Sequence, residues 1–254
     1  MTGKLDSARV QSELFSKLDR PFTGEALFDR LGDVVYFIKN SRGEYVVVNQ
    51  TLVERTGRRR KSELIGRRAD EIFPEPFGSS YREQDDLVLR SGKEILDQLE
   101  LHFYPSGGRG WCLTNKLPLW GRDARVIGLV GVSKDLQAAN ERSEDYSLVA
   151  RAVQHMHAHY GQSLRVKDLA SRAALSQYQF EQRIRKIFQL TAGQLIQKVR
   201  MDAAVRRLRE TGDSIAVVAL DCGYSDQSAF ARQFRQTVGV SPSEYRRSLA
   251  NNPH

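Results

Sequence analysis

The chain has 254 residues, which is too long for one small domain and fits two compact units, each with its own core. Its hydrophobic content is 40% and its charged content is 28%, and no apolar run approaches the roughly 20 residues that span a bilayer. Charged side chains interrupt the N-terminal segment, which excludes a secretory signal there. We therefore expect a cytoplasmic protein without a membrane partner.

The basic charge is unevenly distributed along the chain. The net charge is +8, and residues 145–254 carry 16 Lys and Arg against nine Asp and Glu. Such a field attracts polyanions and favours a nucleic-acid partner, although a membrane surface or solubility alone also fits. The two cysteines, Cys112 and Cys222, are expected in different domains as buried thiols, which excludes a disulfide framework.

The N-terminal segment and a hairpin come first in chain order. Apolar residues at imperfect helical spacing predict a short amphipathic helix over residues 5–18, within an N-terminal extension of residues 1–24. Two β-rich runs, residues 34–38 and 45–48, flank a turn that contains Gly43 and predict an antiparallel hairpin.

Helical segments and three longer strands follow the hairpin. The last of these helices is expected to end at Gly92, where glycine can supply a left-handed C-cap. Turn-forming stretches then separate strands predicted over residues 94–104, 111–119 and 126–132. Together these elements predict an α+β domain, with a five-stranded antiparallel sheet and helices on one side.

This domain resembles a PAS domain. The residues that carry the resemblance are the opening hairpin, residues 33–38 with Gly43 and residues 45–49, the turn Glu63-Leu64-Ile65-Gly66-Arg67, and the last strand with its closing Asp-Leu pair, residues 126–136. The resemblance implies a sensory domain over residues 25–136. It also implies that a signal leaves through the polar linker that follows, residues 137–147.

Strand alternation indicates what this domain holds inside. Leu99, Leu101 and Phe103 alternate with polar neighbours, as do Trp111, Leu113 and Asn115, so these two sets are expected to face the interior. His102 and Cys112 then point outward, which argues against haem and against a flavin adduct. An unidentified small-molecule ligand is one interpretation, and a closed core that serves only dimerisation is the other. The pocket would be lined by Tyr36, Asn49, Leu101, Phe103, Trp111, Leu113 and Asn115.

From residue 163 onward the pattern is helical and contains a helix-turn-helix outline. Residues 166–173 predict a short helix before a turn. Ser176 and Gln179 then predict a capping box that begins a second helix, which runs to Phe188.

The same outline occurs again about fifty residues later. Residues 215–222 predict a short helix, and Ser225 is the expected N-cap of a helix over residues 227–238 that ends at Gly239. A long helix over residues 192–211 carries one apolar stripe and joins the two units. We therefore expect an all-α C-terminal domain with two helix-turn-helix units over residues 148–250.

The physical reason for such a pair is groove geometry. Two recognition helices on one rigid body can enter successive major grooves that lie about 34 Å apart. Apolar residues four apart should face the core on each second helix, and Arg232 on the opposite face has the chemistry to read guanine. Arg185 and Arg235 fit phosphate contacts better. The predicted DNA-contacting residues are Gln177, Tyr178, Glu181, Gln182, Arg185, Gln227, Ser228, Ala231, Arg232 and Arg235.

The C-terminal domain resembles the AraC family of transcriptional regulators. The second unit carries the resemblance through residues 223–235, Gly239-Val240-Ser241-Pro242 and Tyr245-Arg246, and the first unit through Asp168-Leu169-Ala170, Leu175-Ser176, Phe180-Glu181 and Phe188. The first unit departs from the family at Gln189, Ala192 and Gln182, where glycine, proline and a base-reading arginine are common. These departures put base contacts by the first recognition helix in doubt.

Enzymatic and metal-binding motifs are not found in the sequence. It contains no P-loop, nucleophile elbow, HExxH or kinase phosphoacceptor segment, so we do not expect an enzyme. His155 and His159 lie one helical turn apart but lack a third ligand, so no metal site is predicted.

The sequence as a whole predicts a sequence-specific transcriptional regulator modulated through a PAS-like domain. The family resemblance implies an activator that binds double-stranded promoter DNA, works as a homodimer and contacts RNA polymerase. The alternative is a PAS-based protein-interaction adaptor whose basic domain binds nucleic acid without sequence specificity.

Overall fold

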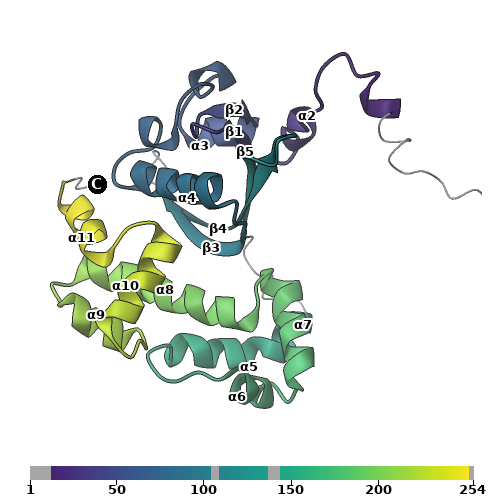
Figure 1. Ribbon diagram of the computed structural model, residues 1–254. Coiled ribbons are helices and arrows are strands. Elements are labelled where there is room, and N and C mark those ends of the chain that lie inside the picture. The colour runs from purple at the N-terminus through teal and green to yellow at the C-terminus, as the bar shows by residue number, and fades with distance from the viewer. Residues whose placement is uncertain (1–12, 104–108, 137–143, 252–254) are drawn as a thin grey trace, which may run out of the picture.

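The computed structural model describes residues 13–103, 109–136 and 144–251 (Figure 1). An α+β unit precedes an all-helical unit, as the sequence patterns predict. Of the expected N-terminal helix, residues 5–12 lie outside the described ranges, residues 13–15 are helical, and Leu14 and Phe15 are exposed. Within the described ranges, no helix is both long and apolar enough to cross a membrane.

The N-terminal unit is built on a five-stranded antiparallel sheet in the order β2-β1-β5-β4-β3. Its helices α3 and α4 bury apolar side chains against the sheet, and α4 ends as predicted at Gly92, whose φ of 66° is left-handed. The strands are β1 Val34–Asn40, β2 Tyr45–Val48, β3 Ile95–Phe103, β4 Arg109–Trp120 and β5 Val126–Asp135. The helices are α2 Glu25–Phe28, α3 Gln50–Arg55, η1 Lys61–Glu63, η2 Ala69–Glu71 and α4 Phe77–Ser91.

The C-terminal unit has two clusters of buried side chains that share one helix. The N-terminal half of α8 packs into the first cluster through Leu195 and Ile196. Its C-terminal half packs into the second cluster through Val205 and Leu208. Its helices are α5 Glu144–Ala158, α6 Val166–Arg172, α7 Gln177–Phe188, α8 Ala192–Glu210, α9 Ile215–Asp221, α10 Gln227–Val238 and α11 Pro242–Asn251. The shared helix makes the two clusters one rigid body.

The side chains of β3 and β4 alternate as predicted, but they face the opposite way. Glu100, His102 and Thr114 line the interior cavity of the N-terminal unit. Leu101 and Trp111 pack instead into the apolar clusters of the C-terminal unit, and Leu113 does the same. The prediction that these apolar residues line the interior is therefore wrong. The reason is that the C-terminal unit buries the outer face of β3 and β4, so both faces of these strands are covered.

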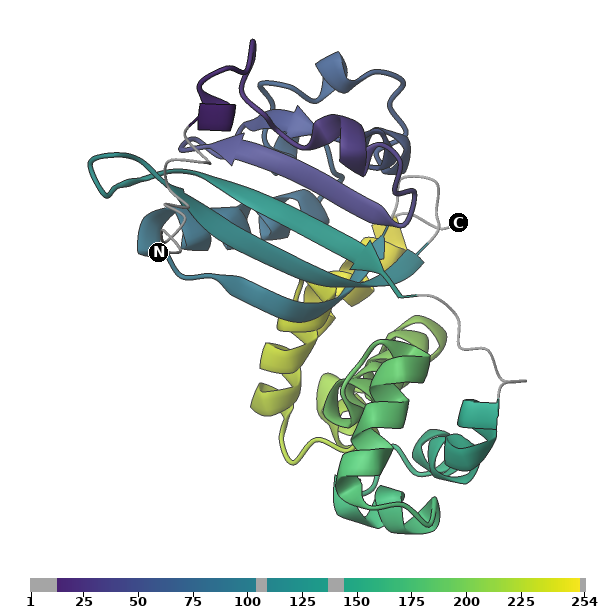
Figure 2. The same cartoon turned by 90° about the vertical axis from the view of Figure 1, so that its right-hand side faces the viewer.

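The two units are held together by polar contacts as well as apolar ones. Trp111 Nε1 donates to Asp202 Oδ1 on α8 over 3.0 Å, and Lys198 lies over the Trp111 ring at 5.1 Å from its centroid. Gln194 Nε2 on the same helix donates to the Asp97 carbonyl oxygen over 3.0 Å. Figure 2 shows the helical unit lying along one side of the sheet. The helical unit is thus held on β3 and β4 by both apolar and polar contacts.

The other predicted pocket residues also lie away from the cavity. Tyr36 stacks on Phe28, and its hydroxyl donates to the Thr23 carbonyl. Asn49 is fully buried, where it accepts from the backbone of Tyr36 and caps α3. Asn115 Oδ1 accepts from the backbone of Asp97 over 2.9 Å. The side chain of Phe103 lies outside the part of the chain that the structure describes. Since these polar groups are satisfied within the fold, they are structural in this conformation.

Candidate nucleic-acid interface and interior cavity

The first helix-turn-helix unit consists of α6, a turn and α7. Ser176 forms the predicted capping box, because its Oγ accepts from Gln179 N while its own N–H donates to Gln179 Oε1. Phe180 and Ile184 are fully buried, as predicted. The opposite face of α7 is open to solvent at Gln177, Tyr178, Gln182 and Arg185.

Glu181 has a different position from its neighbours on α7. Its carboxylate accepts from the backbone N–H of Ala192 at the start of α8, at 3.1 and 3.3 Å. It also lies 3.8 Å from Arg185 Nε. Glu181 therefore ties α7 to the N-terminus of α8, where a negative charge is favourable.

The second unit consists of α9, a turn and α10. The predicted N-cap, Ser225, is wrong by one residue: Asp226 Oδ1 accepts from Ala229 N over 2.7 Å and caps the helix. At the turn, Gly223 has a φ of 80°, and a Cβ atom there would lie 2.6 Å from the Tyr160 carbonyl oxygen. The turn therefore requires glycine, for its conformation and for space.

The exposed face of α10 carries the side chains that fit a DNA groove. Phe230 and Phe234 are fully buried, as predicted, which fixes the rotation of the helix. Gln227, Ser228 and Arg232 lie on the exposed side, and Ala231 is half-buried between them. No ion pair joins Arg232 to another described residue, so within the described ranges its guanidinium is available for a base edge.

Arg235 is engaged with the N-terminal unit. Its Nη2 lies 2.6 Å from Glu83 Oε2 on α4, and its Nη1 lies 3.5 Å from Glu244 Oε2 on α11. Beside this pair, Gln98 Nε2 on β3 donates to the Gln236 carbonyl oxygen over 3.4 Å. The C-terminal part of α10 thus lies against the N-terminal unit, while its N-terminal part is open. In Figure 1, α10 lies next to α4 and β3.

The N-terminal unit contains a charged interior that the sequence patterns did not reveal. Lys39 and Lys116 both pair with the buried carboxylate of Asp85, the latter over 2.7 Å. Burial alone raises the pKa of Asp85, but the charges of the two lysines outweigh it and leave that pKa below its ordinary value. Without its partner, each of these buried charges would strongly destabilise the domain, so the three side chains depend on one another.

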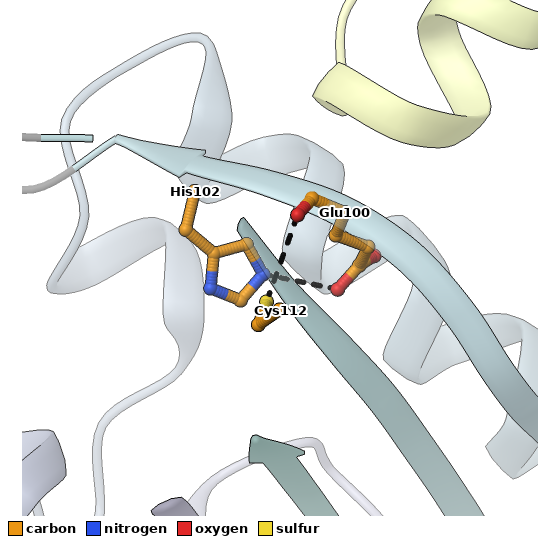
Figure 3. Close-up of side chains that lie close together, drawn as sticks. All are labelled: Glu100, His102 and Cys112. Carbon is orange, nitrogen blue, oxygen red and sulfur yellow. Dashed lines mark hydrogen bonds and ion pairs between the residues drawn. The ribbon is translucent and has the colours of Figure 1, made fainter. Parts of the chain in front are cut away.

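A second polar group lies beside this triad (Figure 3). His102 Nε2 lies 3.0 Å from Glu100 Oε2, and Cys112 Sγ lies 3.8 Å from the Glu100 carbonyl oxygen. Burial alone lowers the pKa of His102, but Cys112 and Glu100 raise it to about 10. Burial alone raises the pKa of Glu100, and His102, Lys116 and Thr114 together lower it to about 2. The expectation that His102 and Cys112 point outward is wrong.

The cavity next to these groups is small. It has a volume of about 50 Å³ and is lined by Glu100, His102, Tyr81 and Gln84, among others. A water molecule needs about 10–15 Å³ on the same measure, whereas pockets for drug-sized ligands run to about 300–1,000 Å³. In this conformation the cavity holds only a very small ligand.

Comparisons with known proteins agree with this division of the chain. Residues 169–248 match the helix-turn-helix domain family, and residues 28–141 match the PAS fold. The protein is thus a PAS fold joined to a helix-turn-helix domain. The C-terminal domain is an AraC-type helix-turn-helix domain, as the resemblance predicts.

Individual relatives are similar to the C-terminal part. The Msm operon regulatory protein of Streptococcus mutans is 33% identical over 117 residues, which are 46% of this chain and 41% of that protein. The HTH-type transcriptional activator RhaR of Mannheimia succiniciproducens is 40% identical over 67 residues, 25% of this chain and 24% of that protein. The DNA-binding domain of AdpA, solved in complex with a target DNA, is 31% identical, with 43% of this chain and 96% of that chain covered and a TM-score of 0.38. The chain spans less than half the length of these curated relatives.

Sequence reasoning missed the charged interior for an identifiable reason. Glu100 and Lys116 occur on predicted strands and Lys39 directly follows one, and their opposite charges signal partners inside the fold. That signal was masked because the apolar set on β3 and β4 was assigned to the interior.

Proposed function

We propose that this chain is a sequence-specific DNA-binding transcriptional regulator. The observation that carries the proposal is the open face of α10, where Gln227, Ser228 and Arg232 lie opposite the buried Phe230 and Phe234. The rigid link supports it further. With 19 residues, α8 is about 29 Å long at about 1.5 Å per residue, which is close to the spacing of successive major grooves.

The two recognition helices have different roles in this proposal. On α10, Arg232 reads a base edge and Arg235 holds a phosphate. On α7, Tyr178 and Arg185 are exposed and fit backbone contacts, whereas Glu181 is occupied at the start of α8. Most of the sequence specificity therefore comes from α10.

The N-terminal unit modulates DNA binding through its contact with α10. Arg235 cannot hold Glu83 and a DNA phosphate with the same nitrogen atoms, so a signal that loosens this contact makes Arg235 available. The likeness to the activator RhaR supports activation. We infer in addition that the protein acts as a homodimer on promoter DNA, with RNA polymerase as a partner. The interior cavity is the proposed place where the signal enters.

The proposal is tested with fragments of the DNA upstream of the protein's own gene. Full-length protein is mixed with these fragments and a large excess of random DNA, and wild type is compared with Arg232→Ala. We expect one fragment to be retained, with a loss of about 1–3 kcal/mol of discrimination in the variant. Arg59→Ala removes the same charge from an exposed position on the N-terminal unit and should leave discrimination unchanged.

The alternative function gives a different result in the same experiment. An adaptor with a non-specific basic domain would bind all fragments alike, with steep salt dependence, and Arg232→Ala would behave like Arg59→Ala. That outcome would reject sequence-specific regulation.

A further inference from the structure

Three side chains with metal-binding chemistry meet inside the N-terminal unit. Glu100 on β3 pairs in register with Cys112 on β4, and His102 follows two residues after Glu100 on the same face. One carboxylate oxygen, one imidazole nitrogen and the thiol sulfur all lie within 4.8 Å of one another. Figure 3 shows the three side chains turned toward one point.

We propose that Glu100, His102 and Cys112 bind one divalent transition-metal ion, with Zn²⁺ as the expected ion. A carboxylate, an imidazole and a thiolate are the three ligand types that Zn²⁺ takes in proteins. The thiolate selects against Mg²⁺ and Ca²⁺, which prefer oxygen ligands. Two of the three ligands line the cavity of about 50 Å³, which offers room for a water molecule or a very small ligand at a fourth position.

The ligands are held in place before any metal binds. Cys112 is fully buried and Glu100 is 3% exposed. Glu100 Oε1 accepts from Gln84 Nε2 and from Gln98 Nε2, each over 2.8 Å, and Oε2 accepts from Thr114 Oγ1. Such outer contacts orient metal ligands, and their loss typically costs about 10–100-fold in affinity. The carboxylate of Glu100 is therefore already oriented by hydrogen bonds before a metal ion binds.

The charge of the interior does not oppose the ion. The neighbouring Lys39, Lys116 and Asp85 carry one positive charge together, and the Glu100 carboxylate cancels it. Metal ligands bind in their deprotonated form, so protons released on binding offset part of the charge that the ion brings.

The site lies on the reverse side of the interdomain contact. Along the same strands, Leu99, Leu101 and Trp111 alternate with the three ligands and pack on the C-terminal unit. The metal ligands are therefore adjacent in sequence to residues of the interdomain contact. A metal ion that draws β3 and β4 together acts on the strands that form this contact. The proposal that these side chains bind a metal ion depends only on the geometry of the interior. The effect of the metal ion on DNA binding rests, in addition, on the proposed function.

The test uses the full-length chain without an affinity tag, stripped with EDTA and titrated with Zn²⁺ or Co²⁺. We expect one ion per chain, with the visible absorption of tetrahedral Co²⁺ and a thiolate-to-metal charge-transfer band. Cys112→Ser should abolish that band and lower the affinity more than about 100-fold, and His102→Asn should lower it similarly. Thr114→Val removes the contacts of Thr114 Oγ1 with Glu100 and Cys112 but no ligand, and it should lower the affinity about 10–100-fold.

Matched controls lie elsewhere in the chain. Cys222→Ser removes the other buried thiol, and His155→Asn disrupts the stacked pair with His159, whose ring centroids lie 4.1 Å apart. Both variants should bind Co²⁺ with the wild-type spectrum. Thermal unfolding without metal checks that each variant is folded, and added Zn²⁺ should raise the Tm of wild type and controls only.

Other outcomes would overturn the metal site. A charge-transfer band that survives Cys112→Ser, or Co²⁺ binding that is lost in His155→Asn and kept in His102→Asn, would place the ion elsewhere. No binding by the folded wild-type chain would reject it outright. DNA titrations with and without Zn²⁺ are read separately: an unchanged Kd with the spectrum intact rejects only the regulatory effect.

Discussion

Arg235 of α10 and Glu83 of α4 form an ion pair between the two units, with 2.6 Å between Nη2 and Oε2. The arginine is one of the predicted DNA-contacting residues, and the glutamate belongs to the PAS fold. The pair therefore gives the N-terminal unit direct contact with the recognition helix. Both side chains are about half exposed or more, so the contribution of the pair to stability is small and it can exchange partners readily.

Removal of the Glu83 charge should strengthen DNA binding. In Glu83→Gln the Nη2 group of Arg235 is freed for phosphate, while Nη1 keeps its pairing with Glu244. We therefore expect the Kd of the full-length chain for its operator to fall by up to about fivefold, since exposed pairs contribute about 0.2–1 kcal/mol. Fluorescence anisotropy at low salt measures this change. Glu54→Gln, an equal charge change on α3, serves as the control. Weaker binding in Glu83→Gln than in Glu54→Gln would contradict the competition.

Arg235→Ala should act differently from Arg232→Ala. A phosphate contact carries no sequence information, so its loss should weaken operator and random DNA alike and reduce the slope of log K against log salt by about 1. Loss of a base contact should instead relax specificity at one base pair. Titrations at several salt concentrations with operator and single-base variants separate the two effects. Equal loss of specificity in both variants would show that Arg235 also reads a base.

Gly223→Ala should destabilise the C-terminal unit. The left-handed conformation costs a residue with a Cβ about 1–2 kcal/mol, and the close contact with the Tyr160 carbonyl adds to this, so we expect a loss of about 2 kcal/mol or more. Urea unfolding followed by circular dichroism measures it. Gly212→Ala is the matched control, because no atom lies within 4 Å of its Cβ position and its φ is not left-handed. A similar midpoint for the two variants would show that the turn relaxes.

Acid should weaken the N-terminal unit through Asp85. The pKa of this carboxyl is lowered in the folded state, so its contribution to the free energy of unfolding is complete above its ordinary pKa and is lost as the pH falls through the folded value. Asp85→Asn should cost about 3–5 kcal/mol at neutral pH, because two buried lysines lose their partner. The variant should also lose less stability than wild type when the pH is lowered.

Urea unfolding from about pH 7 to about pH 3 measures both effects, since the ordinary pKa of Asp lies near 3.9. Asp86→Asn, the neighbouring position on α4, is the control, because Asp86 is only half-buried and pairs with exposed Arg90. If the stability of Asp85→Asn depended on acid as steeply as that of wild type, other carboxyls would be responsible.

The candidate site was only partly predictable from the sequence. The capping box at Ser176, the buried Phe230 and Phe234 and the left-handed Gly239 follow from local spacing, so the sequence locates both helix-turn-helix units. The capping residue of α10 was placed one position early, because Ser225 and Asp226 are both good N-caps and only the backbone decides between them. The engagement of Arg235 could not be foreseen, since its partner lies 152 residues away along the chain.

Local periodicity determined the helices, the strands and the alternation of side chains, because each depends on residues within a few positions of one another. Only the tertiary structure decided which face of β3 and β4 is the interior. A strand with one buried face has its apolar residues inside, but here the C-terminal unit covers the second face and takes Leu99, Leu101 and Trp111. The interior is left to Glu100, His102 and Cys112, which is tolerable because each of these groups finds a partner there.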